Sequence, residues 1–489
     1  MRWGVVGMSS SSLPKSTSFT AAGEPERSLR LSILEGCSSA VLGALTGEAV
    51  LTALLLSFGA LDYHIGSMSA LGTLSMIGAL LGARWVARTG RRKPLVILTS
   101  LVARLAPALA AFLPFTPWSS RTRILVMLGL VAASGVLVNM AGNAWVSWMA
   151  ALVPPVRRGR YFALRNSIVN AVGMLASYGV GHLLALLQAK TPSRPEVFVP
   201  FLLASVPFTL FTTWVYTRQW EPEGNRETVE PIHAMFVSAF SIPGFRRLVT
   251  FSMCWAAVLG VASPFFLPHM LQHLGFSMRE VAMYSILSNG IGLASQPLWG
   301  RVADRAGHRP VLLFCMPIVG SLPLWWLIAT PNRWWPIWVD ALLTGLFWPG
   351  LNLAHFNMAL DLAPARHRTA CLGVRTLLTG VAQAVASLLG GYGAYALDQL
   401  PVWTRSGFTN YHVLFLTTAF GRWALIPMAR RLPEPRAWPV SALVRFASTA
   451  ASKLFLDGVA QGWVWLARRP SRPATPKDSE HPPEARRGP

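Results

Sequence analysis

The sequence has little charge and little cysteine for its length. Only 13% of its 489 residues are Asp, Glu, Lys or Arg, whereas soluble domains carry roughly 25%. This shortage argues against a soluble enzyme. The cysteines Cys37, Cys254, Cys315 and Cys371 lie far apart, so their spacing indicates neither a disulfide framework nor a metal site. We expect no metal and no cofactor.

Acidic residues are especially scarce, but the resulting basic surplus does not indicate a nucleic-acid-binding protein. The chain has 43 Lys and Arg against 20 Asp and Glu, a net charge of +23. No zinc-ligand spacing and no aromatic-basic RNA motif accompanies this charge. Membrane proteins concentrate Lys and Arg in their cytoplasmic loops, and this tendency accounts for the same surplus. We therefore expect no nucleic-acid partner.

Apolar residues, in contrast, are abundant along the whole length. They make up 53% of the chain, aromatic residues make up 11%, and the mean hydropathy is +0.43. Disordered chains are poor in aromatics, so this composition predicts a polytopic protein of the lipid bilayer. Residues 1–30 contain no apolar run long enough for a signal peptide, and we expect them to form a cytoplasmic tail.

Twelve apolar segments have the length of a membrane span. The alternating pattern of barrel strands is absent, so the segments predict transmembrane helices and an all-α membrane protein. The expected spans are 31–59, 65–86, 94–117, 124–153, 167–189, 198–217, 248–272, 281–299, 310–330, 334–362, 376–398 and 411–429.

These spans divide the chain into two bundles of six helices. The first bundle is expected over 31–217 and the second over 248–430, with a polar cytoplasmic loop at 218–247 between them. Residues 431–489 are expected to hold an amphipathic helix on the membrane surface and a disordered tail. Most Lys and Arg lie in the loops on one side, so both termini are expected in the cytoplasm.

The two bundles repeat each other in their loops. Gly82-Ala-Arg-Trp-Val-Ala-Arg-Thr-Gly-Arg-Arg-Lys follows the second span, and Gly300-Arg-Val-Ala-Asp-Arg-Ala-Gly-His-Arg follows the eighth. Leu-Val-Pro at 152–154 and Leu-Ala-Pro at 362–364 align at an offset that also superposes Arg165 on Arg375. Equivalent loops in each half indicate a parallel repeat about an axis along the membrane normal.

On these motifs the chain resembles the major facilitator superfamily (MFS), of the bacterial type. The family signature after the second span is Gly-x-x-x-Asp-Arg-x-Gly-Arg-Arg/Lys, often repeated after the eighth. The first copy departs from it at Ala83 and Ala87, where Gly and the acid are usual. The residues that match it in the two copies are Arg88, Gly90, Arg91, Arg92, Gly300, Asp304, Arg305, Gly307 and Arg309.

The resemblance implies that this loop acts as a latch on a cytoplasmic gate. Asp304 is the candidate latch acid, because the first copy has Ala87 in its place. The basic residues of the motif have a second interpretation, in which they only fix the topology of the chain in the membrane.

Charged residues within the spans are functional candidates, because they are costly in lipid. Glu48 lies well inside the first span, and the family resemblance implies that this span lines the central cavity. Glu48 is therefore a candidate proton carrier or substrate contact, or else a carboxylate satisfied by packing. Arg104 needs a counter-ion, and Glu35 and Glu48 are both available. Asp340 is expected near the outer surface, where water reaches it easily.

Polar side chains also repeat on two spans that the resemblance places at the cavity. They either line a water-filled cavity or join helices by hydrogen bonds. The fourth span carries Asn139, Asn143 and Ser147, and the tenth carries Asn352, His355 and Asn357.

The expected function is that of a secondary active transporter without enzymatic activity. The resemblance implies that the two bundles alternate access to a small solute at a midplane site, with a symport or antiport mechanism. No P-loop is present, so an ion gradient, such as that of protons, or the solute's own gradient would supply the energy. The alternative is a membrane sensor or membrane enzyme on the same scaffold. We expect a monomer in a bacterial inner membrane.

Overall fold

A computed structural model of the chain describes residues 24–191, 194–222, 236–237, 239–364, 368–400, 408–434, 438–439 and 441–442. Within these residues the regular secondary structure is helical, apart from one isolated bridge between Thr330 and Arg333. The chain divides into two compact units, residues 1–437 and residues 438–489. All the helices named below lie in the first unit. The amphipathic helix expected after residue 431 lies outside the described residues.

The first half of the chain contains six membrane-length segments, several of them built from two helices. Their elements are α1 (Glu24–Thr46), α2 (Glu48–Ser57), α3 (Asp62–Leu74), α4 (Ile77–Thr89), α5 (Lys93–Leu109), the 3-10 turn η1 (Ala110–Phe115), α6 (Ser120–Leu152), α7 (Pro155–Lys190), the 3-10 turn η2 (Pro195–Phe198) and α8 (Val199–Arg218). Helix α1 begins at Glu24, within the tail expected at 1–30.

The second half repeats this arrangement. Its elements are α10 (Pro243–Ala262), η3 (Ser263–Phe265), α11 (Phe266–Pro268), the π-turn η4 (His269–His273), α12 (Met278–Ala306), α13 (His308–Leu327), α14 (Trp335–Leu362), α15 (Arg368–Asp398), α17 (Asn410–Ala424) and α18 (Ile426–Arg430). Helix α10 begins inside the loop expected at 218–247, so the polar connection is shorter than predicted.

Ten helical segments of the described chain are long and apolar enough to cross a membrane. Two of the twelve expected spans are not among them. Helix α12 carries polar residues along much of its length, and the last span is split at Leu425 into α17 and α18. Both still pack as full members of the bundle, α12 on α14 and α17 on α13, so the helical arrangement contains all twelve positions.

Breaks in the first and seventh spans fall at glycine or proline. Gly47 is extended between α1 and α2, where a Cβ atom would meet the carbonyl oxygen of Gly43. Pro264 and Pro268 lie in the irregular stretch between α10 and η4. Proline removes a backbone donor and clashes with the preceding turn, which accounts for the interruption of the seventh span.

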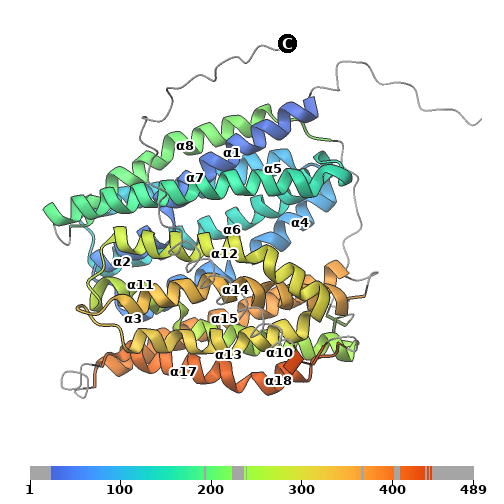
Figure 1. Cartoon of the computed structure of the whole chain (residues 1–489). Helices are drawn as coiled ribbons and strands as arrows, with labels where there is room; N and C mark the ends of the chain where they lie inside the picture. Colours follow the sequence, from blue (N-terminus) through green and yellow to red (C-terminus); the bar gives the residue numbers. More distant parts are fainter. Residues whose placement is uncertain are drawn as a thin grey trace, which may run out of the picture. The chain divides into compact units, whose positions relative to one another are not determined.

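Each half packs mainly on itself. In the first half α1 packs on α7 and α8, and α5 packs on α6 and α8; in the second, α10 packs on α15, and α13 packs on α14 and α17. Figure 1 shows α1 and α8 side by side in one group and α13 and α17 in the other. Such grouping follows from short connections between antiparallel neighbours.

Two helix pairs make most of the contact between the halves, α3 with α15 and α7 with α12. Glycine permits the close approach in both. A Cβ atom on Gly66 would lie 2.5 Å from the carbonyl oxygen of Ser387, and one on Gly181 would lie 2.6 Å from that of Met278. We call this region the closed end of the bundle. The opposite end, which carries the loops at 84–93 and 300–309, is called the motif end.

Candidate functional site

A large cavity lies between the two halves. It has a volume of about 970 Å³ and is lined by α1, α7, α12 and α14. The contact of Gly181 with Met278 lies on its closed-end side. Most of the polar groups that line it are uncharged, among them Asn170, Asn289 and Asn352. Among its described lining residues, Arg165 carries the one charged side chain.

A smaller cavity, here called the central cavity, collects most of the charge. It measures about 530 Å³, and its lining includes Glu48, Asp340 and Arg422. It shares Thr344 and Trp348 with the large cavity. Residues from the first half thus meet residues from the second around one space.

Glu48 stands at the break in the first span. Gly47 ends the preceding helix, and Glu48 is the first residue of α2. Its side chain is exposed to two cavities, the central one and a lateral cavity of about 750 Å³. A carboxylate in the first turn of a helix interacts favourably with the helix dipole, and here its oxygens remain available to both cavities.

Asp340 contradicts the expectation of easy solvation near the outer surface. Its side chain is only 2% exposed, because Trp326 and Tyr284 line the same space. Oδ2 accepts a hydrogen bond from the Tyr284 hydroxyl at 2.7 Å, and Oδ1 has no partner among the described residues. Such a carboxylate retains acceptor capacity inside the cavity.

Arg422 supplies the positive charge of the central cavity. It is 4% exposed, donates from Nη1 to the carbonyl oxygen of Val319 at 2.8 Å, and lies over the ring of Trp348. Its Nε atom has no hydrogen-bond partner in the described structure. Buried arginines are normally paired, so an available donor here marks a site rather than a structural bridge.

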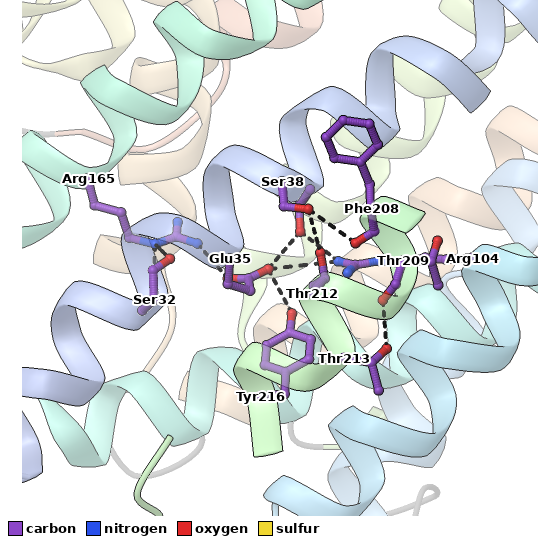
Figure 2. Close-up of polar contacts among 11 residues, drawn as sticks. Ser32, Glu35, Ser38, Arg104, Arg165, Phe208, Thr209, Thr212, Thr213 and Tyr216 are labelled. Carbon is purple, nitrogen blue, oxygen red and sulfur yellow. Dashed lines mark hydrogen bonds and ion pairs between the residues drawn. The ribbon is translucent and has the colours of Figure 1, made fainter. Parts of the chain in front are cut away.

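Glu35 lies at the centre of a polar cluster (Figure 2), and Ser39 and Arg165 of this cluster also line the large cavity. Arg165 donates from Nη2 to Oε2 at 3.1 Å, and Tyr216 and Ser39 donate to Oε1 at 2.8 and 2.7 Å. Arg104 approaches the same carboxylate at 3.8 Å and donates to the Ser39 hydroxyl at 2.8 Å. Glu35 therefore links four helices, α1, α5, α7 and α8.

The cluster resolves the partner of Arg104. Of the two carboxylates available, Glu35 is the ion-pair partner, whereas Glu48 shares only the lateral cavity with Arg104. Nη1 of Arg104 has no hydrogen-bond partner among the described residues. Arg104 is thus anchored to Glu35 on one side and still lines a cavity on the other.

Arg165 has a counterpart in the second half with a different environment. Arg375 donates from Nε to the Ser252 hydroxyl at 3.2 Å, and that hydroxyl lies 2.7 Å from Nε2 of His355. His355 is buried there and belongs to none of the three cavity linings. The sequence shows Arg165 and Arg375 only as an aligned pair. Both lie beside polar loops, so the sequence does not indicate that they are withdrawn from solvent.

The polar stripe on α6 joins helices. Asn139 donates to the Ser75 hydroxyl at 3.1 Å, and Ser147 accepts from Nε of Arg92 at 2.9 Å. Asn143 is exposed and lines none of the three cavities. On α14, Asn352 lines the large cavity, whereas Asn357 does not.

The motif loops share a feature that the signature does not contain. In the first half the backbone N–H groups of Arg92 and Lys93 donate to Oε1 of Glu221, at 2.5 and 3.1 Å. In the second half those of His308 and Arg309 donate to the two carboxylate oxygens of Glu434, at 2.8 and 2.5 Å. Each glutamate caps a helix whose first N–H groups lack intrahelical partners.

Four of the nine signature residues are exposed at the surface. Gly90 and Gly307 have positive φ values of 70° and 94°, which suit glycine at a helix end. Gly300 has open space around it. Arg309 also donates from Nη1 to the carbonyl oxygen of Leu432 at 3.2 Å. The exposed members are Arg88, Arg91, Asp304 and Arg305.

Comparison with known proteins supports one family. Residues 31–294 and 259–470 each match the Major Facilitator Superfamily. A multi-drug resistance efflux pump, PmrA of Streptococcus pneumoniae, is 26% identical over 176 residues, which cover 35% of this chain. That match spans 43% of the pump, less than half of its length.

Solved structures share the fold at low sequence identity. A point mutant of the nucleoside transporter NupG has a TM-score of 0.61 at 15% identity, covering 83% of this chain and 100% of that one. A D-xylose-proton symporter has a TM-score of 0.58 at 14% identity, covering 83% and 98%. With twelve helices in two repeats and a family match along most of its length, this chain belongs to the Major Facilitator Superfamily.

Proposed function

We propose that the chain is a secondary active transporter that moves a small solute across a membrane by alternating access. The observation that carries this proposal is the large cavity between the halves together with the glycine contacts on its closed-end side. A cavity at a repeat interface, closed on one side, is the arrangement that alternating access requires. A sensor or an enzyme on the same scaffold has no such requirement.

The proposal includes an orientation. Basic residues gather in the loops at the motif end, and cytoplasmic loops carry such an excess. We place the motif end and both termini in the cytoplasm of a bacterium, with the chain a monomer in the inner membrane. The described state is then open to the cytoplasm and closed to the outside.

Proton coupling is assigned to Glu48. Its carboxylate lines both the central and the lateral cavity, and no hydrogen bond or ion pair joins it to another side chain among the described residues. A carboxylate in such a position can exchange its proton with water in either cavity. In this proposal, proton binding at Glu48 precedes the change of access.

Alternating access is tested by a cross-link at the closed end. The hydroxyl oxygens of Ser69 on α3 and Ser387 on α15 lie 3.5 Å apart. In a protein without its four native cysteines, S69C/S387C should form a disulfide on oxidation and hold that end closed. G72C/S387C is the control, because Gly72 on the same helix has open space around its Cβ position.

The readout is the labelling of a cysteine at position 352 in the large cavity by a membrane-impermeant maleimide, followed by mass spectrometry. We expect oxidation to keep this position fully reactive and reduction to slow its labelling, as the cavity closes for part of the time. Equal labelling in both states would contradict alternating access and favour the sensor. Proton uptake in proteoliposomes, lost in Glu48→Gln, tests the coupling separately.

A further inference from the structure

The central cavity presents both signs of charge to its contents, each with an unused polar atom. Oδ1 of Asp340 and Nε of Arg422 lack partners among the described residues, although both side chains are more than nine-tenths buried. Burying a polar group without a hydrogen bond is costly. Two such groups lining one cavity indicate that a ligand supplies the missing partners.

The hydrogen bonds that Asp340 and Arg422 already make show which of their polar atoms are available to a ligand. Asp340 uses Oδ2 for the Tyr284 hydroxyl, and Arg422 uses Nη1 for the Val319 carbonyl. Both side chains are thereby held in place, while Nε of Arg422 and Oδ1 of Asp340 remain without a partner among the described residues. Glu48 from the first half adds a second carboxylate to the same lining.

The rest of the lining is apolar and aromatic. Trp326, Trp348 and Phe266 lie among aliphatic side chains around the charged groups. A purely cationic solute would be repelled by Arg422, and a purely anionic one by Asp340 and Glu48. A neutral apolar solute would leave the charged atoms unpaired inside the cavity, which is unfavourable.

We infer that the central cavity binds a zwitterionic solute of the amino-acid class that carries an aromatic or large apolar side chain. The carboxylate of the solute accepts from Arg422, its ammonium group donates to Asp340 and Glu48, and its side chain packs among the aromatic rings. The cavity volume of about 530 Å³ lies within the usual range for small-molecule sites, about 300–1,000 Å³. This inference rests on the proposed transport function.

Three ligands that share one aromatic ring separate the contributions of the positive and the negative charge of the solute. L-Phenylalanine has both charges, phenethylamine only the positive one, and 3-phenylpropionate only the negative one. Binding to the purified full chain is measured by calorimetry and by the shift in melting temperature. We expect L-phenylalanine to bind at least about tenfold more tightly than either analogue, because each analogue leaves either Nε of Arg422 or Oδ1 of Asp340 without a hydrogen-bond partner.

Two variants test which residue binds each charged group of the solute. Arg422→Gln should remove the advantage of L-phenylalanine over phenethylamine, and Asp340→Asn should remove its advantage over 3-phenylpropionate. Exposed residues of the same segments provide matched controls, Arg430→Gln on α18 and Asp361→Asn on α14, and both should bind all three ligands as the unmodified protein does.

Three results would overturn the inference. Equal affinity for phenethylamine and L-phenylalanine would define a cation site, and equal affinity for 3-phenylpropionate an anion site. Failure of all three ligands to bind would exclude an aromatic zwitterion. If the S69C/S387C cross-link still controlled labelling at position 352, that failure would leave the transport proposal intact.

Discussion

Tyr411 on α17 donates a hydrogen bond from its hydroxyl to Oδ1 of Asp62 on α3, at 2.5 Å. Asn410 donates to the other carboxylate oxygen at 2.7 Å. These bonds join α3 of the first half to α17 in the last span of the second half. They lie at the closed end, beside the contact of Gly66 with Ser387, and stabilise that end by hydrogen bonding.

Tyr411→Phe should weaken the closure. A hydrogen bond to a charged group contributes about 1.5–3 kcal/mol, so its loss should reduce the closed population and slow disulfide formation in S69C/S387C. The cross-linking rate measures this. Tyr392→Phe is the control, because Tyr392 is exposed and stacks on Tyr63 through its ring alone. Equal slowing by both variants would contradict the assignment.

Gly66→Ala should hinder the approach of α3 to α15. The added Cβ would lie 2.5 Å from the Ser387 carbonyl oxygen, so one helix must move away. Gly72→Ala on the same helix meets nothing within 4 Å and should stabilise by about 0.5–1 kcal/mol, because alanine favours the helix. Melting temperatures should therefore shift in opposite directions. A shift in the same direction would show that the close contact is not maintained.

Glu35→Ala should be strongly destabilising. Arg165 and Arg104 would lose their shared carboxylate, and breaking a buried ion pair costs about 3–5 kcal/mol. Thermal unfolding in detergent measures the loss. Glu26→Ala serves as the control, since its pair with Arg157 is exposed on both sides and contributes about 0–1 kcal/mol. Comparable melting temperatures for the two variants would refute the role of the cluster.

Glu221→Ala should destabilise the first turn of α5, and Glu434→Ala should destabilise the first turn of α13. Loss of such a cap costs about 1 kcal/mol, so the amides of Arg92 and Lys93, or of His308 and Arg309, should exchange hydrogen faster. Mass spectrometry of the two peptides checks each variant against the other, since each should affect only its own half. Asp304→Ala should leave both peptides unchanged in the state described here, because that carboxylate is exposed.

The helices and the repeat could be predicted because they depend on local properties. Length, apolar character and proline position determine where a span begins, breaks or ends. The match of 152–154 with 362–364 likewise requires only the order of residues along the chain. These features do not depend on how the helices are oriented about their own axes.

The charged cavity could not be predicted, because it depends on that orientation. Asn139 and Ser147 share one face of α6, as their spacing predicts, but this face meets neighbouring helices. The position of Asp340 early in α14 suggests the membrane surface, whereas Tyr284 and Trp326 from other helices exclude water from it. Arg422 has no carboxylate near it in the sequence, so its place beside Asp340 depends on the packing of distant segments.

The close approach of backbones at the closed end limits how this protein can diverge. Where Gly66 meets Ser387 and Gly181 meets Met278, main-chain atoms occupy the space that a side chain would need. A new solute can be accommodated by exchanging side chains around the cavity, but a larger residue at either glycine would hold the halves apart whatever the solute. Among descendants that acquire different specificities, we expect these two positions to remain glycine while the cavity lining changes.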